Sequence, residues 1–434
     1  MQTKAKEKIN IVTLGCAKNL VDSEVLMTQL KGNKKDVFHQ REDINPDIVI
    51  INTCGFIDKA KQESIDTILK HAKEKEDGII KKLYVTGCLS ERYKDDLKTD
   101  IPEVDGFYGT RDLPELLKNF EAKYRNELLG DRIITTDSHY AYLKISEGCD
   151  RPCSFCAIPL MRGRHISKPI DQIILEAKNL VRNGVREIML IAQDSTYYGI
   201  DIYKKRAMSE LLKKLSDVED LDWIRIHYAY PAGFPMDIIE VMRERDNICN
   251  YLDIPLQHGS TNMLKVMKRG ITREKTDELI KNIRDINPEI ALRTTLIAGH
   301  PGETERDFQE MYDFVERSQF DRLGIFTYSH EEGTSAHKLE DNVPEKVKRS
   351  RSNKIMALQQ KISIEKNKNK VGKTVKVLID RVDANNYYGR TEQDSPEVDN
   401  EVIIPSTEMH LRVGDFYDVK ITDSKEYDLI GKVD

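Results

Sequence analysis

Short apolar runs alternate with amphipathic stretches along most of this chain. Near the N-terminus the apolar runs are rich in β-branched residues and lie at 8–16, 47–54 and 82–88. Such short runs, bounded by Gly or Pro, are typical of buried parallel strands. Apolar residues at helical spacing follow each run and predict helices over 19–31, over 58–75 and from Ser90 onward. The pattern predicts a small parallel α/β domain.

The middle of the chain repeats a strand-then-helix pattern. Six predicted strands lie at 142–146, 187–193, 222–227, 251–255, 291–298 and 322–328. Helical patterns lie near 170–183, 207–217, 235–245, 273–286 and 304–318. Right-handed crossovers would curl such units into a barrel or an open half-barrel, with functional loops at the C-terminal ends of the strands.

The composition changes towards the C-terminus. Residues 344–370 hold nine Lys/Arg and two Glu, and Pro344 suits the first turn of a helix. We expect a long basic helix there, which is either a solvated linker or a contact for RNA phosphates. After Val371, short alternating runs separated by Gly and Asp turns predict a small antiparallel barrel of about five strands.

Composition and charge narrow the class of protein. The 434 residues are 39% hydrophobic and 33% charged, which fits a globular protein of several domains. No stretch predicts a membrane span or a signal peptide. Seven cysteines, an odd number, fit a reducing compartment, so we expect a cytoplasmic protein. The net charge of −6 belongs to residues 371–434, which hold eight Lys/Arg and fourteen Asp/Glu.

Three cysteines lie close together in the sequence EGCDRPCSFC at 147–156. Cys149, Cys153 and Cys156 have the spacing C-x3-C-x2-C. Iron–sulfur clusters are held by cysteine thiolates and usually take four ligands. A structural zinc site would be closed by four protein ligands, and no nearby His or Cys supplies the fourth. The loop therefore predicts an iron–sulfur cluster with one iron open to a substrate or cofactor.

Three further cysteines, Cys16, Cys54 and Cys88, each end a predicted strand of the N-terminal domain. In a parallel sheet those ends share one edge, which is where open α/β sheets bind ligands. We expect the three to converge on a second cluster, although buried free cysteines are often inert core residues. Cys249 has no ligand spacing to another cysteine, so we expect it to lie in the core, like Trp223.

Three residues of the middle domain are weaker candidates. Gln257 follows the fourth strand and could bond a ribose or carboxylate, or cap a helix. Arg293 lies within the fifth strand and needs a partner if it is buried, either a cofactor carboxylate or a structural one. Gly299 begins the turn GHPGE, which could admit a polar ligand, although a glycine-rich turn alone is weak evidence.

The C-x3-C-x2-C loop, with an aromatic residue before its last cysteine, resembles the signature of radical S-adenosylmethionine (SAM) enzymes. The whole chain resembles their methylthiotransferase family, and in particular its branch acting on a ribosomal protein aspartate, the RimO family. The stretches that carry this resemblance are TLGCAKNLVDSE at 13–24, EGCDRPCSFCAIPLMRGRHIS at 147–167, LIAQDSTYYGID at 190–201, YLDIPLQH at 251–258, YSHEEGTSA at 328–336, YYGRT at 387–391 and YDLIG at 427–431. His300 departs from the family, in which we expect an aromatic or bulky apolar residue there.

The resemblance implies a fold of three domains. They are a Rossmann-like parallel α/β domain over 1–130, a radical SAM partial (βα)6 barrel over 131–368 and a small antiparallel β-barrel of the TRAM type over 369–434. It also implies two four-iron four-sulfur clusters, each on one cysteine set, with SAM chelating the open iron of the radical SAM cluster. Gln257, Arg293 and Gly299 would then contact SAM.

The implied reaction inserts a methylthio group at the β-carbon of one aspartate in small-subunit ribosomal protein twelve, using two SAM molecules. That C–H bond is unactivated, so the reaction needs a radical oxidant supplied by a cofactor. Expected partners are the ribosomal protein, docked through the acidic C-terminal barrel, an external electron donor and a sulfur source. We expect no membrane contact and no direct tRNA binding.

Two alternatives remain. A tRNA adenosine methylthiotransferase would use the same chemistry, but the acidic barrel and the branch motifs disfavour it. A non-catalytic iron–sulfur redox protein or scaffold would hold closed clusters, and two sets of three cysteines disfavour that.

Overall fold

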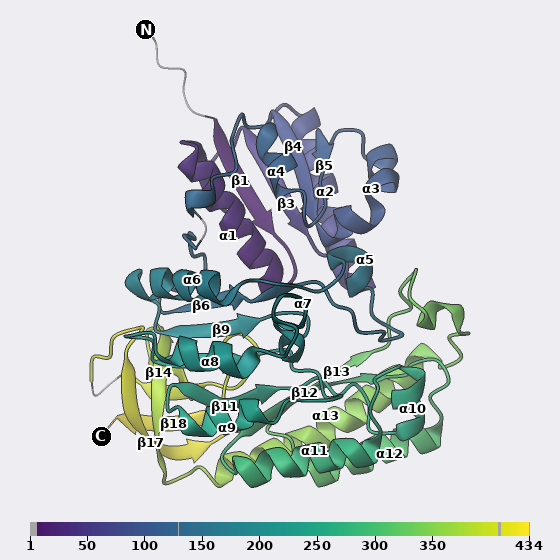
Figure 1. Ribbon diagram of the computed structural model, residues 1–434, viewed down its shortest axis with the longest axis vertical. Helices are drawn as coiled ribbons and strands as arrows, with labels where there is room; N and C mark the ends of the chain where they lie inside the picture. Colours follow the sequence, from purple (N-terminus) through teal and green to yellow (C-terminus); the bar gives the residue numbers. More distant parts are fainter. Residues whose placement is uncertain (1–6, 129, 407–408, 434) are drawn as a thin grey trace.

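The computed structural model describes residues 7–128, 130–406 and 409–433. They form a five-stranded parallel sheet, a six-stranded open parallel sheet and a closed five-stranded barrel, in chain order (Figure 1). This architecture confirms the predicted fold class. Among the described helices, none is long and apolar enough to cross a membrane.

The N-terminal sheet has the strand order β2-β1-β3-β4-β5. Its strands are β1 (Lys8–Thr13), β2 (Asp36–His39), β3 (Ile48–Thr53), β4 (Lys82–Gly87) and β5 (Gly106–Phe107). The helices are α1 (Ala17–Gly32), α2 (Asp58–Glu76), α3 (Cys88–Asp100) and α4 (Leu113–Lys118), with a 3-10 turn at Asn126–Leu128. Every residue of the central strand β3 is buried, as its apolar sequence IVIINT requires between two layers of helices.

The central sheet has the order β13-β12-β11-β10-β9-β6, and all its strands are parallel. Its strands are β6 (Tyr140–Lys144), β9 (Glu187–Ile191), β10 (Trp223–Ile226), β11 (Ile248–Asp253), β12 (Ala291–Ala298) and β13 (Arg322–Thr327). The covering helices are α6 (Ile170–Arg182), α8 (Met208–Ser216), α9 (Asp237–Glu244), α11 (Arg273–Ile286) and α12 (Glu305–Ser318). Five amphipathic helices and six strands thus confirm the repeating pattern.

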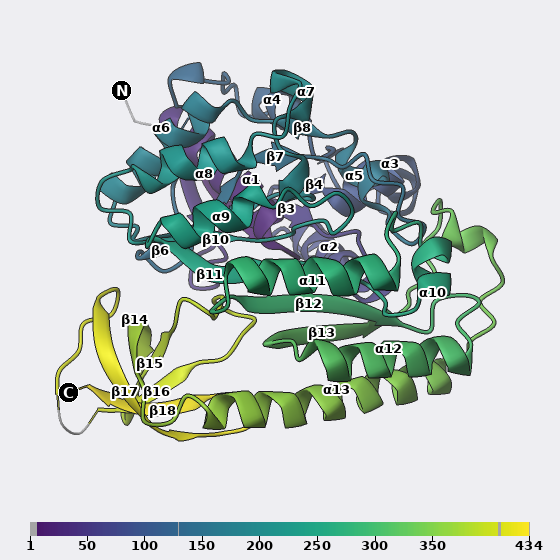
Figure 2. The ribbon, with the colours of Figure 1, turned by 60° about the horizontal axis from the view of Figure 1, so that its bottom comes forward.

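Shorter elements fill the loops of the central domain. They are β7 (Ser146–Glu147), β8 (Ile166–Ser167), α5 (Ile158–Arg162), α7 (Ile200–Tyr203), α10 (Thr261–Val266) and the 3-10 turns Ser195–Tyr197 and Ala336–Lys338. The expected basic helix is α13 (Glu345–Lys368), which runs alongside α12 to the C-terminal barrel (Figure 2). It packs Ile355, Leu358 and Ile362 into the main core. Some of its cations point inward, because Arg351 pairs with the buried Glu303 at 2.7 Å.

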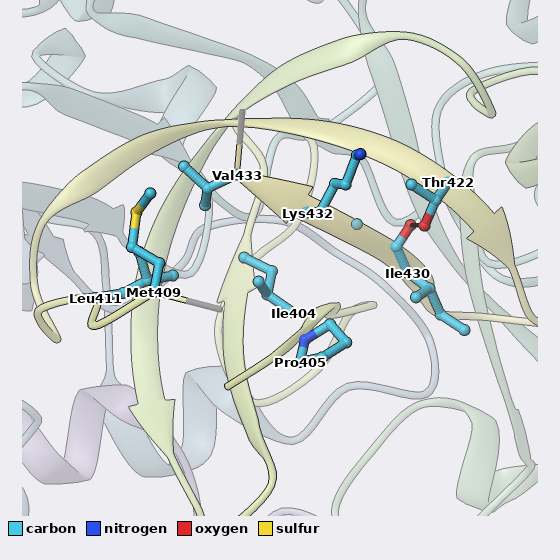
Figure 3. A pocket seen from close by; sticks show the side chains of 9 residues that line it. Ile404, Pro405, Met409, Leu411, Thr422, Ile430, Lys432 and Val433 are labelled. Carbon is cyan, nitrogen blue, oxygen red and sulfur yellow. Dashed lines mark hydrogen bonds between the residues drawn. The ribbon is translucent and has the colours of Figure 1, made fainter. Parts of the chain in front are cut away.

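The C-terminal barrel has the closed order β14-β15-β16-β18-β17. Its strands are β14 (Thr374–Val382), β15 (Asn386–Arg390), β16 (Val402–Pro405), β17 (Phe416–Ser424) and β18 (Leu429–Val433). The pairing is antiparallel except between β16 and β18, which are parallel. A mostly apolar pocket of about 210 Å³ opens beside β16 and β18, lined by Ile404, Met409, Ile430 and neighbouring residues (Figure 3).

Trp223 and Cys249 are buried where the central sheet meets the C-terminal barrel. Their exposed fractions are 3% and 1%, and they pack with Tyr251, Leu378 and Phe416. Both core predictions are therefore confirmed.

Candidate active site

The loop that carries Cys149 is fixed on both sides. Strands β7 and β8 pair antiparallel around it, and the Cys149 amide donates to the Gly163 carbonyl at 3.1 Å. Gly148 has φ +75°, and a Cβ there would lie 2.1 Å from the Arg164 carbonyl oxygen, so only glycine fits. The Ser154 amide donates across the loop to the Met267 carbonyl at 3.0 Å. The three cysteines of this loop therefore sit on a rigid frame.

Cationic and hydroxyl groups surround these thiols. Arg269 Nη1 lies 3.1 Å from Cys153 Sγ, and the Tyr230 hydroxyl lies 3.8 Å from the same sulfur. The guanidinium groups of Arg151 and Arg269 both stack on the Tyr230 ring, at 4.1 and 4.3 Å from its centroid. Thiolates need such neighbours, because hydrogen bonds to sulfur stabilise their charge and help set the potential of an iron–sulfur cluster.

Burial disfavours the thiolate form of Cys149 and Cys156. It raises the pKa of Cys149 to about 11 and that of Cys156 to about 12. A metal that binds these sulfurs must displace their protons, because only the thiolate is a ligand. Three sulfurs, a half-buried setting and nearby hydrogen-bond donors together fit a thiolate-held cluster.

The cysteines of the N-terminal domain converge as expected. Cys16 directly precedes α1, Cys54 follows β3 and Cys88 begins α3 after β4. A Cβ on Gly15 would lie 2.6 Å from the Cys54 Cβ, so the ends of β1 and β3 are in contact. Burial, with Cys16 and Cys54 nearby, raises the pKa of Cys88 to about 12. The three thiols thus share one edge of the sheet.

Among the described residues, no three His, Cys, Asp or Glu side chains are arranged around a single ion. Each thiolate of a cluster binds its own iron, so cluster ligands need not share one coordination sphere. The donor chemistry of both sets, three cysteine thiols each, suits iron–sulfur clusters. The ligand roles of the six cysteines stay predictions.

The short helix α5 lies between the two cysteine sets. Ala157 and Met161, which follow Cys156, pack directly on Cys88. On the other side, Val21 of α1 packs against Tyr142 and Met189 of the central sheet. The two cysteine sets therefore lie on either side of α5, where the N-terminal and central domains meet.

The three weaker candidates lie in different settings. Gln257 has φ +76°, and its backbone pairs with β12. Gly299 has φ +79°, and a Cβ there would lie 2.2 Å from Lys348 Cγ of α13, so glycine is required whether or not a ligand binds. Arg293 lies 3.0 Å from Asp253 and 3.3 Å from Asp399. Arg293 thus has structural carboxylate partners, and SAM contacts of all three stay predictions.

His300 takes the place of a bulky residue in the core. It has no exposed surface, and its Nε2 lies 3.3 Å from Ser154 Oγ of the cysteine loop. Its ring lies edge-on to Phe155 and against Tyr328, with centroids 6.4 and 5.0 Å away. Burial lowers the pKa of His300 to about 4, so the ring is neutral near pH 7. His300 therefore packs under the cysteine loop as a neutral ring.

The acidic C-terminal segment uses several of its carboxylates internally. Residues 391–400, between β15 and β16, contact the central sheet. Asp394 Oδ1 accepts from Arg322 Nε at 2.9 Å, and Asp399 Oδ2 accepts from the Tyr251 hydroxyl at 2.8 Å. Glu397 accepts from the Tyr140 hydroxyl at 3.2 Å. These carboxylates fasten the barrel to the sheet, so the acidity of the segment is only partly available to a basic partner.

Sequence reasoning did not single out Asn19, Arg162, Arg269 or Tyr230, although each lies at the site. Asn19 and Arg162 stand in the quoted motifs TLGCAKN and AIPLMRG. Arg269 and Tyr230 stand in no motif, and only the fold brings them to Cys153. The available signal in the sequence was an arginine, Arg162, in the motif that follows Cys156.

Three family models match successive parts of the chain. "Radical SAM superfamily" matches residues 143–315, "Uncharacterized protein family UPF0004" matches 8–109 and the TRAM domain matches 371–433. Two solved structures share the fold at low identity. The radical SAM methyltransferase TsrM from Kitasatospora setae has TM-score 0.56 and 14% identity over 74% of this chain and 72% of that one. The SAM radical enzyme OxsB has TM-score 0.55 and 13% identity over 77% and 54%. The fold and the cysteine loop define a radical SAM enzyme.

Relatives that match over almost the full length of the chain narrow the class of protein to one family of radical SAM enzymes. "Ribosomal protein uS12 methylthiotransferase RimO" from Cytophaga hutchinsonii is 59% identical over 428 residues, 99% of this chain and 98% of the relative. The protein of the same name from Bacteroides thetaiotaomicron is 53% identical over 429 residues, again 99% and 98%. The chain belongs to the ribosomal protein uS12 methylthiotransferase RimO family.

Proposed function

We propose that this protein transfers a methylthio group to the β-carbon of an aspartate in ribosomal protein uS12 by radical SAM chemistry. The observation that carries this proposal is that the two three-cysteine sets lie on either side of α5, whose residues Ala157 and Met161 pack on Cys88. One set alone would serve many radical SAM reactions. A second set at the same site supplies the place for a sulfur donor next to the radical chemistry.

In this proposal the two cysteine sets would hold two different clusters. Cys149, Cys153 and Cys156 hold the radical SAM cluster, and the N-terminal set holds an auxiliary cluster. With SAM bound and an electron supplied, such a site provides a 5′-deoxyadenosyl radical, which is strong enough to take a hydrogen atom from an unactivated C–H bond. Gln257, Arg293 and Gly299 are the proposed SAM contacts.

Two segments of the chain cover parts of the inner face of the central sheet. The segment 391–400 covers the beginning of the strands, and α1 covers β6 and β9. Lys18 of α1 is buried with its Nζ 3.1 Å from the centroid of the Tyr228 ring. A closed interior suits radical chemistry, because water and stray groups would quench or divert the reactive species.

We place the domain boundaries after residues 130 and 368.

The proposed reaction uses two SAM molecules in each turnover. An external electron donor and a sulfur source are needed. The ribosomal protein docks through the acidic charges of the C-terminal barrel that the central sheet leaves unpaired, and the reaction takes place in the cytoplasm, where uS12 is made.

The test is mass spectrometry of uS12 and of total tRNA from cells with and without the gene. Loss of the methylthio mass from one uS12 aspartate, with tRNA unchanged, is the expected result. Loss from a tRNA adenosine instead would overturn the assigned substrate and leave the chemistry in place. No change in either would overturn the proposed reaction.

A further inference from the structure

Asn19 lies where the three cysteine-bearing strand ends meet. It is completely buried in α1, three residues after Cys16. Its Nδ2 donates to the carbonyl oxygens of Leu14 at 2.7 Å and Thr53 at 3.0 Å. Its Oδ1 lies 3.7 Å from Cys88 Sγ. One side chain therefore joins the ends of β1 and β3 and the start of α3.

Arg162 reaches this point from the central domain. It is the last residue of α5 and is 2% exposed. Its Nη2 donates to Asn19 Oδ1, and its Nη1 donates to Asp22 at 2.7 Å and Glu147 at 3.1 Å. Lys144 binds the same two carboxylates. The cations and carboxylates balance, so the arginine is held in place without a net buried charge.

Arg162 and the two carbonyls require the same orientation of the Asn19 amide. A guanidinium donates hydrogen bonds and accepts none, so the atom that faces it must be the amide oxygen. Nδ2 must then face the carbonyls of Leu14 and Thr53, which is the orientation the structure has. A flipped amide would place donors against donors and carbonyl against carbonyl. The bond from Arg162 thus reinforces the orientation in which Asn19 contacts the strand ends.

We propose that Asn19 and Arg162 are positioning residues for the auxiliary site. Asn19 fixes the spacing of the chain segments that carry Cys16, Cys54 and Cys88, and Arg162 locks that arrangement to the radical SAM loop. The inference deepens the proposed function and rests on its assignment of these cysteines to a cluster. Groups that orient metal ligands in this way typically change metal affinity or activity about 10- to 100-fold when they are removed.

The test uses the full-length protein, reconstituted anaerobically with iron and sulfide. Asn19→Ala and Arg162→Met are compared with the wild type by iron and sulfide content, by the electron paramagnetic resonance signals of the reduced clusters and by the rate of iron loss to a ferrous chelator. We expect one of two clusters to be lost, or to release iron about 10- to 100-fold faster. The radical SAM cluster keeps its signal. Arg162→Lys, which can still donate to Asn19, restores part of the retention.

A matched control separates positioning from domain docking. The Arg132 side chain is 1% exposed and lies 3.0 Å from Glu24 of α1 and 3.2 Å from Glu176 of α6. Arg132→Met therefore removes another buried arginine between the same domains. The partners of Arg132 are the two carboxylates and the Tyr142 carbonyl, and none of them bonds to a cysteine. We expect it to lower the thermal stability and to leave both cluster signals intact. If Asn19→Ala does not fold, Asn19→Asp, which keeps the acceptor and loses the two donors, is expected to show the same cluster loss.

The outcomes distinguish the inference from the proposal beneath it. Wild-type iron content, chelator kinetics and spectra in both the Asn19 and Arg162 variants would overturn the inference. The same cluster loss in Arg132→Met would also overturn it, because the effect would then belong to docking. A wild-type protein that holds only one cluster would instead overturn the assignment of the second site.

Discussion

Glu187 offers a stringent test of how the C-terminal barrel is attached. It is the first residue of β9 and has no exposed surface. Arg225 Nε donates to its Oε1 at 2.7 Å, and Arg390 Nη1 of the barrel donates to its Oε2 at 2.6 Å. Glu187→Gln keeps the shape of the side chain and removes the charge that the two arginines share.

The magnitude follows from the burial of the group. Removing one partner of a buried ion pair costs about 3–5 kcal/mol, because the remaining charge stays buried without compensation. Here that charge is Arg225, since Arg390 keeps Asp380 at 2.7 Å. For a domain of this size a destabilisation of 1 kcal/mol lowers the Tm by about 2–4 °C. We therefore expect Glu187→Gln to lower the Tm of the transition that includes the barrel by about 6–20 °C.

The assay is thermal unfolding of the metal-free protein at neutral pH, followed by circular dichroism and calorimetry. Glu401→Gln is the control, because its partner Arg381 is 52% exposed and surface pairs contribute about 0–1 kcal/mol. A Glu187→Gln protein within about 1 kcal/mol of the control would refute the reasoning, since the pair would then not hold the barrel.

Three further predictions concern single side chains. Burial lowers the pKa of His300 from 6.5 to about 4, so protonation of the unfolded chain lowers the stability of the fold as the pH falls from 6.5 towards 4. His300→Phe should make the free energy of unfolding, measured by urea titration, less dependent on pH in this window, and an unchanged pH dependence would contradict a buried, neutral His300. Gly299→Ala should lower the Tm more than Gly302→Ala does, because both residues have positive φ but only a Cβ at Gly299 would clash with α13. Equal losses of Tm would show that backbone strain alone causes the destabilisation. Cys249→Ala should leave the iron content of the reconstituted protein unchanged while Cys54→Ala lowers it by one cluster, as iron analysis would show, and equal iron content in the two variants would contradict the ligand assignment.

Elements with a strong pattern could be predicted from the sequence. The six strands of the central sheet and the five helices that cover it lie within a few residues of their predicted positions, because each has its own apolar face. The convergence of Cys16, Cys54 and Cys88 also followed from local information. Strand ends of a parallel sheet meet at one edge, whatever lies between them in the chain.

Features that depend on docking between domains could not be predicted. Strands β2 and β5 have four and two residues, too few to show a period, and they form because a sheet edge is available. The bond between Arg162 and Asn19 joins residues 143 positions apart, and the one between Arg390 and Glu187 spans 203. The acidity of the last segment predicted a surface for a basic partner, whereas part of it fastens the barrel to the central sheet. Composition gives the number of charges but not their partners.

The measurement that tests the central claim most directly is turnover by the purified protein. The reconstituted enzyme is mixed with SAM, a low-potential reductant, sulfide and uS12, and the ribosomal protein is then analysed by tandem mass spectrometry. The account predicts a methylthio group on the β-carbon of one uS12 aspartate. It also predicts that the group is absent when Cys149, Cys153 and Cys156 are replaced by Ala, and when Cys16, Cys54 and Cys88 are. Unmodified uS12 with the wild-type protein carrying both clusters, or full modification by a variant lacking either set, would contradict it.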